Sequence, residues 1–481
     1  MPRANLGRQA KIVATLGPAS SDQDTIGRLI TAGMNVARIN MSHGDHAGHA
    51  ALIDNIRQAS RQVGLEVAIL IDLQGPKIRV DELPEPLELR AGEIWVIGPA
   101  RVKDAYPEYR DRFIPTVYEK LVDDCRDGHL VLFNDGAIVA RAVARDREVY
   151  RLRIEVGGRL TSHKGINLPH SRISAPSFTA KDREDLLFGL EHGVDYVALS
   201  FVRQPDNVNE VREFMAARQH QLPIVAKIEN PEGIDNIEAI IAVSEVIMIA
   251  RGDMGVEVGN HLVPAIQKRI INLCNRSGVP VITATQMLES MINSPTPTRA
   301  EASDVANAVW DGTDALMLSA ETAAGRYPLE AITMMSRIIH EAEKTPKKRP
   351  SIRTLDLSRV DDSIMLAASL VAEKVGARRI LAVTESGRSC LKISHYRPRV
   401  SILGISYDLR TVRRLCLYWG VSPFLLRNYR EDHPRLEEDV IEQVRQDCEL
   451  EAGDRIVITR GSGSFFARGS SNSVKVKTLP G

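Results

Sequence analysis

The sequence predicts an α/β protein of three domains: a (β/α)8 barrel, known as a TIM barrel, a small β-barrel domain inserted in it, and a C-terminal open α/β domain. Two observations lead to this prediction. Eight short apolar runs alternate with amphipathic stretches, which is typical of strands buried on both faces of a parallel sheet. The length of 481 residues suits about three domains.

The eight predicted barrel strands fall in two blocks. They begin at Lys11, Asn35 and Glu66 in the first block, and at Tyr196, Pro223, Val246, Pro280 and Ala315 in the second. Three residue pairs are expected to open helices between them: Ser21 with Asp24, Thr179 with Asp182, and Thr298 with Glu301. Gly33 is expected to end the first of these helices.

The predicted domain limits follow the pattern along the chain. We expect the barrel over residues 1–73 and 178–345, the insertion over 74–177, and the C-terminal domain over 350–481. The insertion shows alternating segments such as HLVLFN and EVYRLRIEV with little helical periodicity. The C-terminal domain has one helical segment and then five strands. A basic, Pro-rich stretch near residues 344–354 is expected to be a linker, with a nucleic-acid patch as the alternative.

Charge, hydrophobic runs and missing motifs exclude several classes of protein. The 62 Lys and Arg residues balance the 62 Asp and Glu residues, so no overall charge attracts a nucleic acid or an anionic membrane. We find no apolar run long enough for a membrane span and no secretory leader, which predicts a cytoplasmic protein. Complete P-loop, GxGxxG and HExxH motifs are also missing from the sequence.

The predicted strands end in polar side chains, whereas a barrel core prefers Val, Ile and Leu. The carboxyl ends of the strands meet at one rim, where active sites of such barrels lie. The polar residues at these ends are Arg38, Asn40, Ser42, His43, Asp72, Ser200, Lys227, Glu229, Arg251, Asp253, Thr285, Ser319 and Glu321. So many charges at one rim indicate a functional site.

Two of these strand ends predict a metal site. Lys227 and Glu229 are two residues apart, so they are expected to point the same way along a strand, and Arg251 and Asp253 repeat that spacing. Mg²⁺ takes one or two protein carboxylates and completes its octahedron with water and substrate oxygens, which suits Glu229 and Asp253. The Gly252 turn could hold a carboxylate on its backbone N–H groups. The residues alone therefore indicate metal-assisted phosphoryl or enolate chemistry.

Sequence motifs along nearly the whole chain resemble those of the pyruvate kinases. They are NVARINMSHG from Asn35, IDLQGPKIR from Ile71, KGINLP from Lys164, IVAKIENPEGI from Ile224, ARGDMGVE from Ala250, ATQMLESM from Ala284, and PTRAEASDVANAVWDGTDALMLSAETA from Pro297. The resemblance implies a glycolytic enzyme that transfers the phosphoryl group of phosphoenolpyruvate to ADP, giving pyruvate and ATP. It also implies one Mg²⁺ or Mn²⁺ on the protein and another arriving with the nucleotide.

The resemblance implies roles for individual residues. Lys227 would stabilise the migrating phosphoryl group, Glu229 and Asp253 would hold the metal, and Arg38 would bind phosphate oxygens. Gly252 and Asp253 with Thr285 would bind the rest of the substrate, and Thr285 would mark where enolpyruvate gains its proton. Arg79 would act with Lys227 and Thr285 in catalysis. The nucleotide would contact Asn40, His43, Arg79 and Lys164, the last on an inserted domain that closes as a lid.

One motif departs from the members of the family that need potassium. These have Thr and Lys before the Gly-Pro of the motif and an acidic residue after it, whereas this chain has Leu73, Gln74 and Lys77. The family's pocket for the monovalent cation would comprise Asn40, Ser42, Asp72 and Leu73. We expect the Lys77 ammonium to replace that cation, so that K⁺ is not required.

A second site is expected in the C-terminal domain. Residues Thr384, Glu385, Ser386, Gly387, Arg388 and Ser389 lie between a predicted strand and helix, where N–H groups and hydroxyls favour a phosphate. Similarity points to a phosphorylated sugar or AMP as effector, although residues 461–473 depart from the version that fits fructose 1,6-bisphosphate. A simple helix cap is the alternative. The resemblance also implies a homotetramer.

Two other functions are alternatives to phosphoryl transfer from phosphoenolpyruvate to ADP. A Mg²⁺-dependent aldolase or lyase that stabilises a pyruvate enolate would not need Lys227 beside a phosphate or a lid bearing Lys164. A non-catalytic metabolite sensor would be expected to have lost one of Lys227, Glu229, Asp253 or Thr285, and all four are present.

Overall fold

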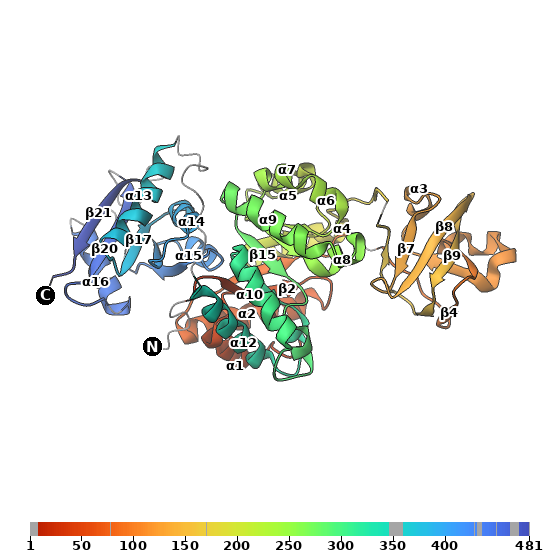
Figure 1. The fold of residues 1–481 in the computed structure, drawn as a ribbon, viewed down its shortest axis with the longest axis horizontal. Coiled ribbons are helices and arrows are strands. Elements are labelled where there is room, and N and C mark those ends of the chain that lie inside the picture. Colours follow the sequence, from red (N-terminus) through yellow and green to blue (C-terminus); the bar gives the residue numbers. More distant parts are fainter. Residues whose placement is uncertain are drawn as a thin grey trace.

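The computed structural model describes residues 8–76, 78–169, 171–345, 359–427, 429–430, 435–448, 450–461 and 471–480. Three bodies lie in a row, with the C-terminal domain at one end, the barrel in the middle and the inserted domain at the other end (Figure 1). The predicted linker near residues 344–354 lies mostly outside the described residues. No helix in the described part of the chain is long and apolar enough to cross a membrane.

The central body is a closed parallel barrel of eight strands, in the order β1-β16-β15-β14-β13-β12-β3-β2. Their bounds are β1 Lys11–Thr15, β2 Val36–Asn40, β3 Ala68–Asp72, β12 Tyr196–Leu199, β13 Ile224–Ile228, β14 Val246–Ala250, β15 Val281–Ala284 and β16 Ala315–Leu318. Nearly every strand residue is buried, because helices cover the outer face and side chains fill the interior. All eight strands predicted from the apolar runs are confirmed.

Helices surround this barrel in the expected alternation. They are α1 Gln23–Ala32, α2 His46–Val63, α4 Ala180–Glu191, α5 Pro205–Ala216, α6 Pro231–Asp235, α7 Ile237–Val243, α8 Arg251–Val258, α9 Val263–Ser277, α10 Arg299–Asp311, α11 Ala320–Ala323 and α12 Pro328–Glu343. The capping boxes at Thr179 and Thr298 are confirmed. The prediction that Ser21 opens α1 is wrong: Asp22 is the N-cap, because its carboxylate accepts the Thr25 N–H at 2.9 Å.

The insertion after β3 is a β domain with its own core, built around Phe133, Trp95 and Leu152. Its strands are β4 Leu87–Leu89, β5 Ile94–Pro99, β6 Phe113–Thr116, β7 Leu130–Phe133, β8 Ile138–Asp146, β9 Val149–Val156, β10 Gly158–Leu160 and β11 Ile166–Asn167, with a short helix α3 Leu121–Asp124. They form a six-stranded sheet, β11-β7-β8-β9-β5-β6, and a two-stranded sheet, β10-β4.

The C-terminal domain is the expected open α/β domain with five strands in the order β19-β18-β17-β20-β21. Its elements are α13 Val360–Lys374, β17 Arg379–Val383, α14 Arg388–His395, β18 Ile402–Ser406, α15 Leu409–Leu415, β19 Val421–Leu425, α16 Leu436–Cys448, β20 Arg455–Gly461 and β21 Ser471–Thr478. The last strand is antiparallel to β20.

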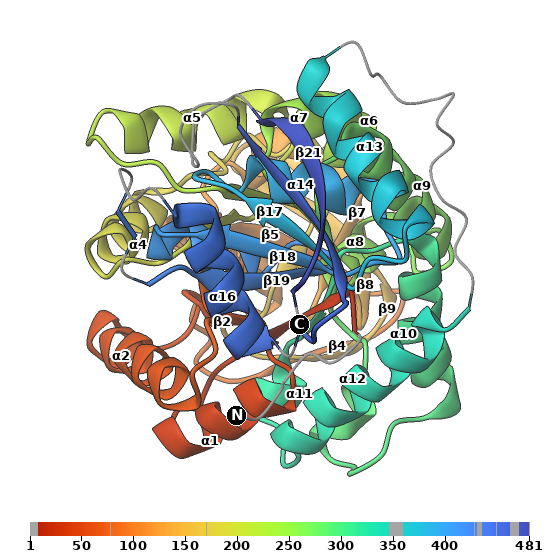
Figure 2. The ribbon, with the colours of Figure 1, turned by 90° about the vertical axis from the view of Figure 1, so that its left-hand side faces the viewer.

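The C-terminal domain covers one end of the barrel (Figure 2). The Lys11 ammonium at the start of β1 donates to the Val421 carbonyl at 2.6 Å, and the Tyr196 hydroxyl at the start of β12 donates to the Arg414 carbonyl at 2.6 Å. These contacts involve the amino ends of the barrel strands. The carboxyl ends therefore face the inserted domain, and the predicted site lies on that side.

Candidate active site

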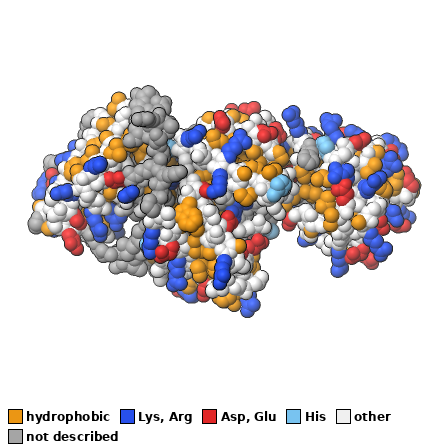
Figure 3. Space-filling view, in the orientation of Figure 1, with side chains coloured by type: hydrophobic (Ala, Val, Ile, Leu, Met, Phe, Trp, Pro, Cys, Tyr) orange, Lys and Arg blue, Asp and Glu red, His pale blue; other side chains and the backbone are white. Residues whose placement is uncertain are grey.

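A cavity of about 1050 Å³ lies between the carboxyl rim of the barrel and the inserted domain. The molecule narrows where these two bodies meet (Figure 3). Twelve of the predicted site residues line this cavity: Arg38, Asn40, Ser42, His43, Asp72, Leu73, Arg79, Lys164, Ser200, Lys227, Glu229 and Asp253. Gly252 and Thr285 are not among its lining residues.

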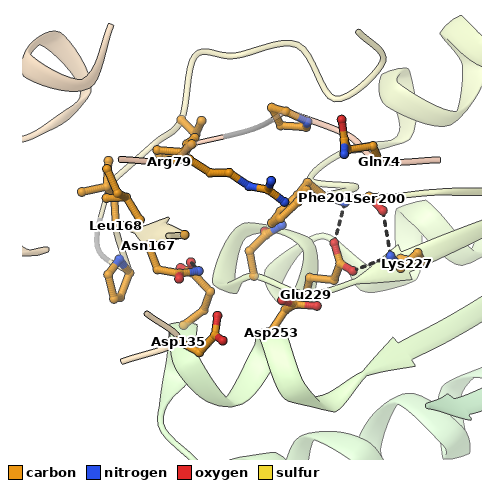
Figure 4. Close-up of a pocket in the computed structure, with 18 of the residues that line it drawn as sticks. Gln74, Arg79, Asp135, Asn167, Leu168, Ser200, Phe201, Lys227, Glu229 and Asp253 are labelled. Carbon is orange, nitrogen blue, oxygen red and sulfur yellow. Dashed lines mark hydrogen bonds and ion pairs between the residues drawn. The ribbon is translucent and has the colours of Figure 1, made fainter. Parts of the chain in front are cut away.

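Lys227 is the centre of a buried polar network at the rim (Figure 4). Its ammonium lies 3.0 Å from Glu229 Oε1 and 3.2 Å from Asp72 Oδ1, and it donates to the Ser200 hydroxyl at 2.7 Å. Burial alone would lower the pKa of Lys227, but the carboxylates of Asp72 and Glu229 outweigh burial and raise it. Lys227 therefore stays positively charged at neutral pH.

Arg38 adds a second cation to this network. Its guanidinium lies 2.6 Å from Asp72 Oδ2 and donates to the Thr15 hydroxyl at 2.8 Å. Burial opposes ionisation of Asp72, yet Lys227 and Arg38 together lower its pKa. Both cations border the cavity, so an anion that entered it would meet two fixed positive charges.

Glu229 and Asp253 have the chemistry of a hard-metal site. Glu229 is 1% exposed, and its Oε2 accepts the Phe201 N–H at 2.7 Å, which fixes the carboxylate. Asp253 lies in the first turn of α8 and lines the cavity. Burial raises the pKa of both carboxyls, so a divalent cation would stabilise their ionised forms.

The donor set fits Mg²⁺ or Mn²⁺ and not a metal that needs a protein cage. Within the described ranges, no group of three or more His, Cys, Asp or Glu side chains could hold a metal ion. Mg²⁺ keeps several waters and substrate oxygens and needs only one or two carboxylates from the protein. Glu229 and Asp253 are therefore sufficient protein ligands for such an ion.

Arg251 does not share the site with Lys227, although its spacing from Asp253 suggested that it would. β14 ends at Ala250 and α8 begins at Arg251, so the alternation of a strand does not continue through this pair. The Arg251 guanidinium instead pairs with Asp304 at 2.7 Å and donates to the Thr285 carbonyl at 2.7 Å. Its role here is to tie α8 to the segment after β15.

Thr285 and Gly252 are bonded to each other at the edge of the site. The Gly252 N–H donates to Thr285 Oγ1 at 2.7 Å, and that hydroxyl donates to the Ala284 carbonyl at 2.7 Å. Thr285 has φ of 68° and Gln286 has φ of 55°, a left-handed conformation that is strained for residues other than glycine. Such strain is concentrated at functional sites, where the surrounding structure holds it.

Three residues of the predicted monovalent-cation pocket, Asn40, Asp72 and Leu73, already have donors within the protein. Asn40 Oδ1 accepts the Ser42 N–H at 3.1 Å, the Leu73 carbonyl accepts the Ser200 hydroxyl at 2.8 Å, and Asp72 is paired with Arg38 and Lys227. Lys77 lies outside the described residues. Its predicted replacement of the cation therefore stays a prediction.

The inserted domain brings Arg79 and Lys164 to the cavity on one antiparallel ribbon. Arg79 pairs with Gly165, and the Val80 N–H donates to the Lys164 carbonyl at 2.9 Å. His43 is exposed in the turn after β2, on the opposite, barrel side of the cavity. The predicted nucleotide contacts thus come from both bodies.

The predicted effector residues lie far from this cavity, in the loop between β17 and α14. Thr384 Oγ1 accepts the Gly387 N–H at 2.9 Å, and Gly387 has φ of 85°, so part of the loop serves to start the helix. Ser386 and Arg388 are exposed, whereas Ser389 is buried. Most of the segment 461–473 lies outside the described residues, so its fit to an effector stays a prediction.

Two residues of the site, Asn167 and Glu257, were missed by the sequence reasoning, and a third, Gln74, was noted only as a departure from the family motif. Gln74 is 9% exposed, and its Nε2 has no hydrogen-bond partner in the described part of the chain. Asn167 and Glu257 line the cavity and are bonded to each other. Glu257 could have been found, because it follows Asp253 by four residues and so shares its helix face.

Comparison with known proteins agrees with this geometry. A family model described as "Pyruvate kinase, barrel domain" matches residues 7–332, and one described as "Pyruvate kinase, alpha/beta domain" matches residues 362–477. A protein named pyruvate kinase from Staphylococcus saprophyticus is 42% identical over 476 residues, and one from Sporosarcina psychrophila is 41% identical over 479 residues. Each alignment covers 98% of this chain and 80% of the relative. The chain belongs to the pyruvate kinase family.

Proposed function

We propose that this phosphotransferase moves the phosphoryl group of phosphoenolpyruvate to ADP, giving pyruvate and ATP. The observation that carries the proposal is the buried Lys227 ammonium between Asp72 and Glu229, beside Asp253 in one cavity. Phosphoryl transfer needs positioning and charge neutralisation more than covalent help from the protein. A fixed cation next to two metal-binding carboxylates supplies both.

Lys227 and Arg38 would hold the phosphoryl group during transfer. Lys227 is kept charged by Asp72 and Glu229, so it would stabilise charge that develops on the equatorial phosphoryl oxygens. Arg38 lies on the other side of Asp72 and would bind further oxygens in the same cavity. Both groups are fixed by hydrogen bonds before substrate arrives, which lowers the cost of reorganisation.

Glu229 and Asp253 would hold the divalent metal, which members of this family generally need. When bound there, Mg²⁺ or Mn²⁺ would neutralise charge on the substrate's carboxylate and phosphate oxygens. The Gly252 turn and Thr285 would receive the carboxylate end of the substrate. Thr285 would then deliver the proton to enolpyruvate through water, because its hydroxyl is a weak acid.

Asn40 and His43 from the barrel, with Arg79 and Lys164 from the insertion, would bind the nucleotide phosphates. The insertion, whose limits we place at residues 74–177 between barrel segments 1–73 and 178–345, would then exclude water from the reacting groups. We also propose a location in the cytoplasm, where glycolysis takes place.

The direct test is a coupled assay of pyruvate formation with ADP present or omitted. We expect ADP-dependent turnover, and a fall of about 10²- to 10³-fold in kcat for Lys227→Met. Lys344→Met is the matched control, because Lys344 is exposed and, among the described residues, its ammonium pairs with the nearby Glu341. Near-wild-type turnover of Lys227→Met would remove Lys227 from the mechanism. Pyruvate chemistry that is independent of ADP would favour a lyase instead.

We further propose that activity needs no monovalent cation, since oxygens of Asn40, Leu73 and Asp72 in the family's cation pocket accept donors from the protein itself. An assay in tetramethylammonium buffer without potassium should show full activity. A rise of about tenfold or more on adding KCl would contradict this proposal.

We place the limits of the C-terminal domain at residues 350–481. We propose that it binds a phosphorylated sugar or AMP at Thr384, Ser386, Gly387, Arg388 and Ser389. We also propose that the protein is a homotetramer. Titration of Ser389→Glu with sugar monophosphates and with AMP tests the site, since a carboxylate there would repel a phosphate. Undiminished activation would rule it out. Light scattering of the full chain measures the oligomeric state.

A further inference from the structure

Several hydrogen bonds among the described residues join the insertion to the barrel near the cavity. The Arg203 guanidinium donates to the Ile173 and Ala175 carbonyls close to the end of the insertion. Another bond joins the insertion to the barrel helix α8. Asn167 Nδ2 donates to Glu257 Oε1 at 2.9 Å, and both residues line the cavity. Asn167 lies on the far side of the cavity from Lys227, among other residues of the insertion (Figure 4). Asn167 lies ten residues before the end of the insertion at Ser177, so this bond adds to the two peptide connections in constraining how the two bodies face each other.

On the insertion side, Asn167 is fixed within the sheet that carries the nucleotide-binding candidates. β11 pairs with β7, with Asn167 opposite Leu132 and Ile166 opposite Phe133. The Ile166 N–H also donates to the Ile78 carbonyl at 2.9 Å. Lys164 precedes Asn167 by three residues on this same ribbon, so a constraint on Asn167 also places Lys164.

On the barrel side, Glu257 lies one helical turn after Asp253 on α8. This helix is anchored by the fully buried Met254 and by the ion pair of Arg251 with Asp304. A Cβ built on Gly136 of the insertion would lie 3.9 Å from Val256 of α8, so a second segment of the insertion reaches the same helix. The hydrogen bond thus connects the ribbon of Lys164 to the helix of Asp253.

Glu257 lies in surroundings where its hydrogen bond to Asn167 contributes to stability. Burial, together with the negative charges of Asp253 and Glu229, raises the pKa of Glu257 to about 7, although the hydrogen bond from the Asn167 amide opposes this rise. Removing the donor of a buried acceptor costs more free energy than removing the donor of an exposed one, because water cannot take the donor's place. Asn167 is the donor that the insertion supplies.

We propose that Asn167 and Glu257 are positioning residues that hold the inserted domain against α8. Lys164 and Arg79 then lie opposite the two carboxylates proposed to bind the metal. This inference rests on the proposed phosphoryl transfer, because it assigns the pair a role in placing the nucleotide side of that site. Neither residue is required to touch substrate. Their effect should therefore fall on the KM for ADP and on the exchange of the ribbon's amide protons.

The test is a double-mutant cycle on the full-length chain. Asn167→Ala and Glu257→Ala should each raise the KM for ADP about tenfold, with kcat within about threefold of wild type. They should also speed hydrogen exchange at the amides of residues 164–167 in the absence of substrate. The double alanine variant should be no worse than either single variant, since one contact is lost in all three.

Nearly isosteric variants separate this role from general damage to the fold. Glu257→Gln keeps an acceptor for Asn167 and should stay within about twofold of wild type. Asn167→Asp places a second carboxyl next to that of Glu257, so it should raise the KM for ADP more than any other single variant. Combining it with Glu257→Gln exchanges donor and acceptor, and should restore both the KM for ADP and the slow exchange. Glu232→Gln, a change of charge on the same cavity wall, is the matched control.

Additive effects in the alanine cycle, or failure of Glu257→Gln to rescue Asn167→Asp, would overturn the proposal. Loss of the proposed function looks different from this outcome. In that case the wild-type chain would form no pyruvate with ADP, while hydrogen exchange in the six variants of the pair would still report whether the pair holds the ribbon.

Discussion

At the scale of single residues, the site depends on a balance of charge around Lys227. Lys227 and Arg38 face the carboxylates of Asp72, Glu229 and Asp253 within one cavity. The carboxylates exceed the cations by one, so a divalent ion would leave a net positive site, as two anionic substrates require. The same balance keeps Lys227 charged although it is only 9% exposed.

Removing Asp72 should upset this balance more than removing any exposed acid. Asp72→Asn would leave Lys227 and Arg38 without their shared partner, and we expect a loss of about 3 kcal/mol in stability together with a large fall in kcat. Thermal unfolding and the coupled assay measure the two effects. Asp104→Asn, at an exposed position of the insertion, should change neither. An unchanged melting temperature for Asp72→Asn would show that the network does not stabilise the fold.

The sequence predicted some of these residues and not others for a physical reason. Lys227 and Glu229 could be paired because they lie at the end of a strand, where alternate residues share a face. The same argument failed for Arg251, since the chain turns into α8 at that residue. Gln74, Asn167 and Glu257 could not be found from strand ends, because two of them lie in the insertion or its connection and the third on a helix.

At the scale of secondary structure, the capping box of α10 holds the segment that carries Thr285. Glu301 accepts the Thr298 N–H at 2.8 Å and also the Ser290 N–H at 2.7 Å. The helix start therefore fixes both its own first turn and the 3-10 turn Glu289–Ile292 that follows Thr285. This box was predicted from Thr298 and Glu301 alone, because its spacing is a local property of the chain.

Thr298→Ala should destabilise the protein by about 1 kcal/mol and lower its melting temperature by roughly 2 °C. The reason is that the Glu301 N–H loses its acceptor at the first turn of α10. Thr31→Ala is the matched control. Thr31 lies inside α1, and within the described part of the chain its hydroxyl donates to the carbonyl one turn earlier, so alanine there should leave the melting temperature unchanged or raise it. Equal effects of the two variants would argue against the cap.

At the scale of the whole molecule, the two outer domains bind opposite ends of the barrel. The insertion faces the carboxyl ends of the strands, and the C-terminal domain contacts the amino ends through Lys11 and through Arg397, which lies 2.9 Å from Asp314. Three domains could be predicted from strand and helix patterns. Their placement could not, because it depends on contacts such as that of Lys11 with Val421, which join residues far apart in the sequence.

The contact of the C-terminal domain with the barrel should weaken in acid. Burial and, to a smaller extent, the charge of Arg397 lower the pKa of His395 to about 4, although Asp362 opposes them. His395 lies against Gly278 of the barrel. The unfolded chain binds a proton near pH 6.5 and the folded chain only near pH 4, so the stability that neutral His395 contributes is lost as pH falls through this window.

His395→Gln removes this titration. Protonation of His395 should make the free energy of unfolding of the wild-type protein about 2 kcal/mol smaller at pH 5 than at pH 7.5. The variant should not show this part of the decrease. Melting temperatures of both proteins at the two pH values give the comparison. The same drop in both proteins would exclude His395 as a source of acid sensitivity.

The most direct measurement of the whole account is anomalous diffraction at the manganese edge from crystals grown with Mn²⁺ and phosphoenolpyruvate. We predict a peak within about 2.0–2.3 Å of carboxylate oxygens of both Glu229 and Asp253, next to the Lys227 ammonium. A manganese ion bound elsewhere, with those two carboxylates left to protein partners alone, would contradict the proposed site.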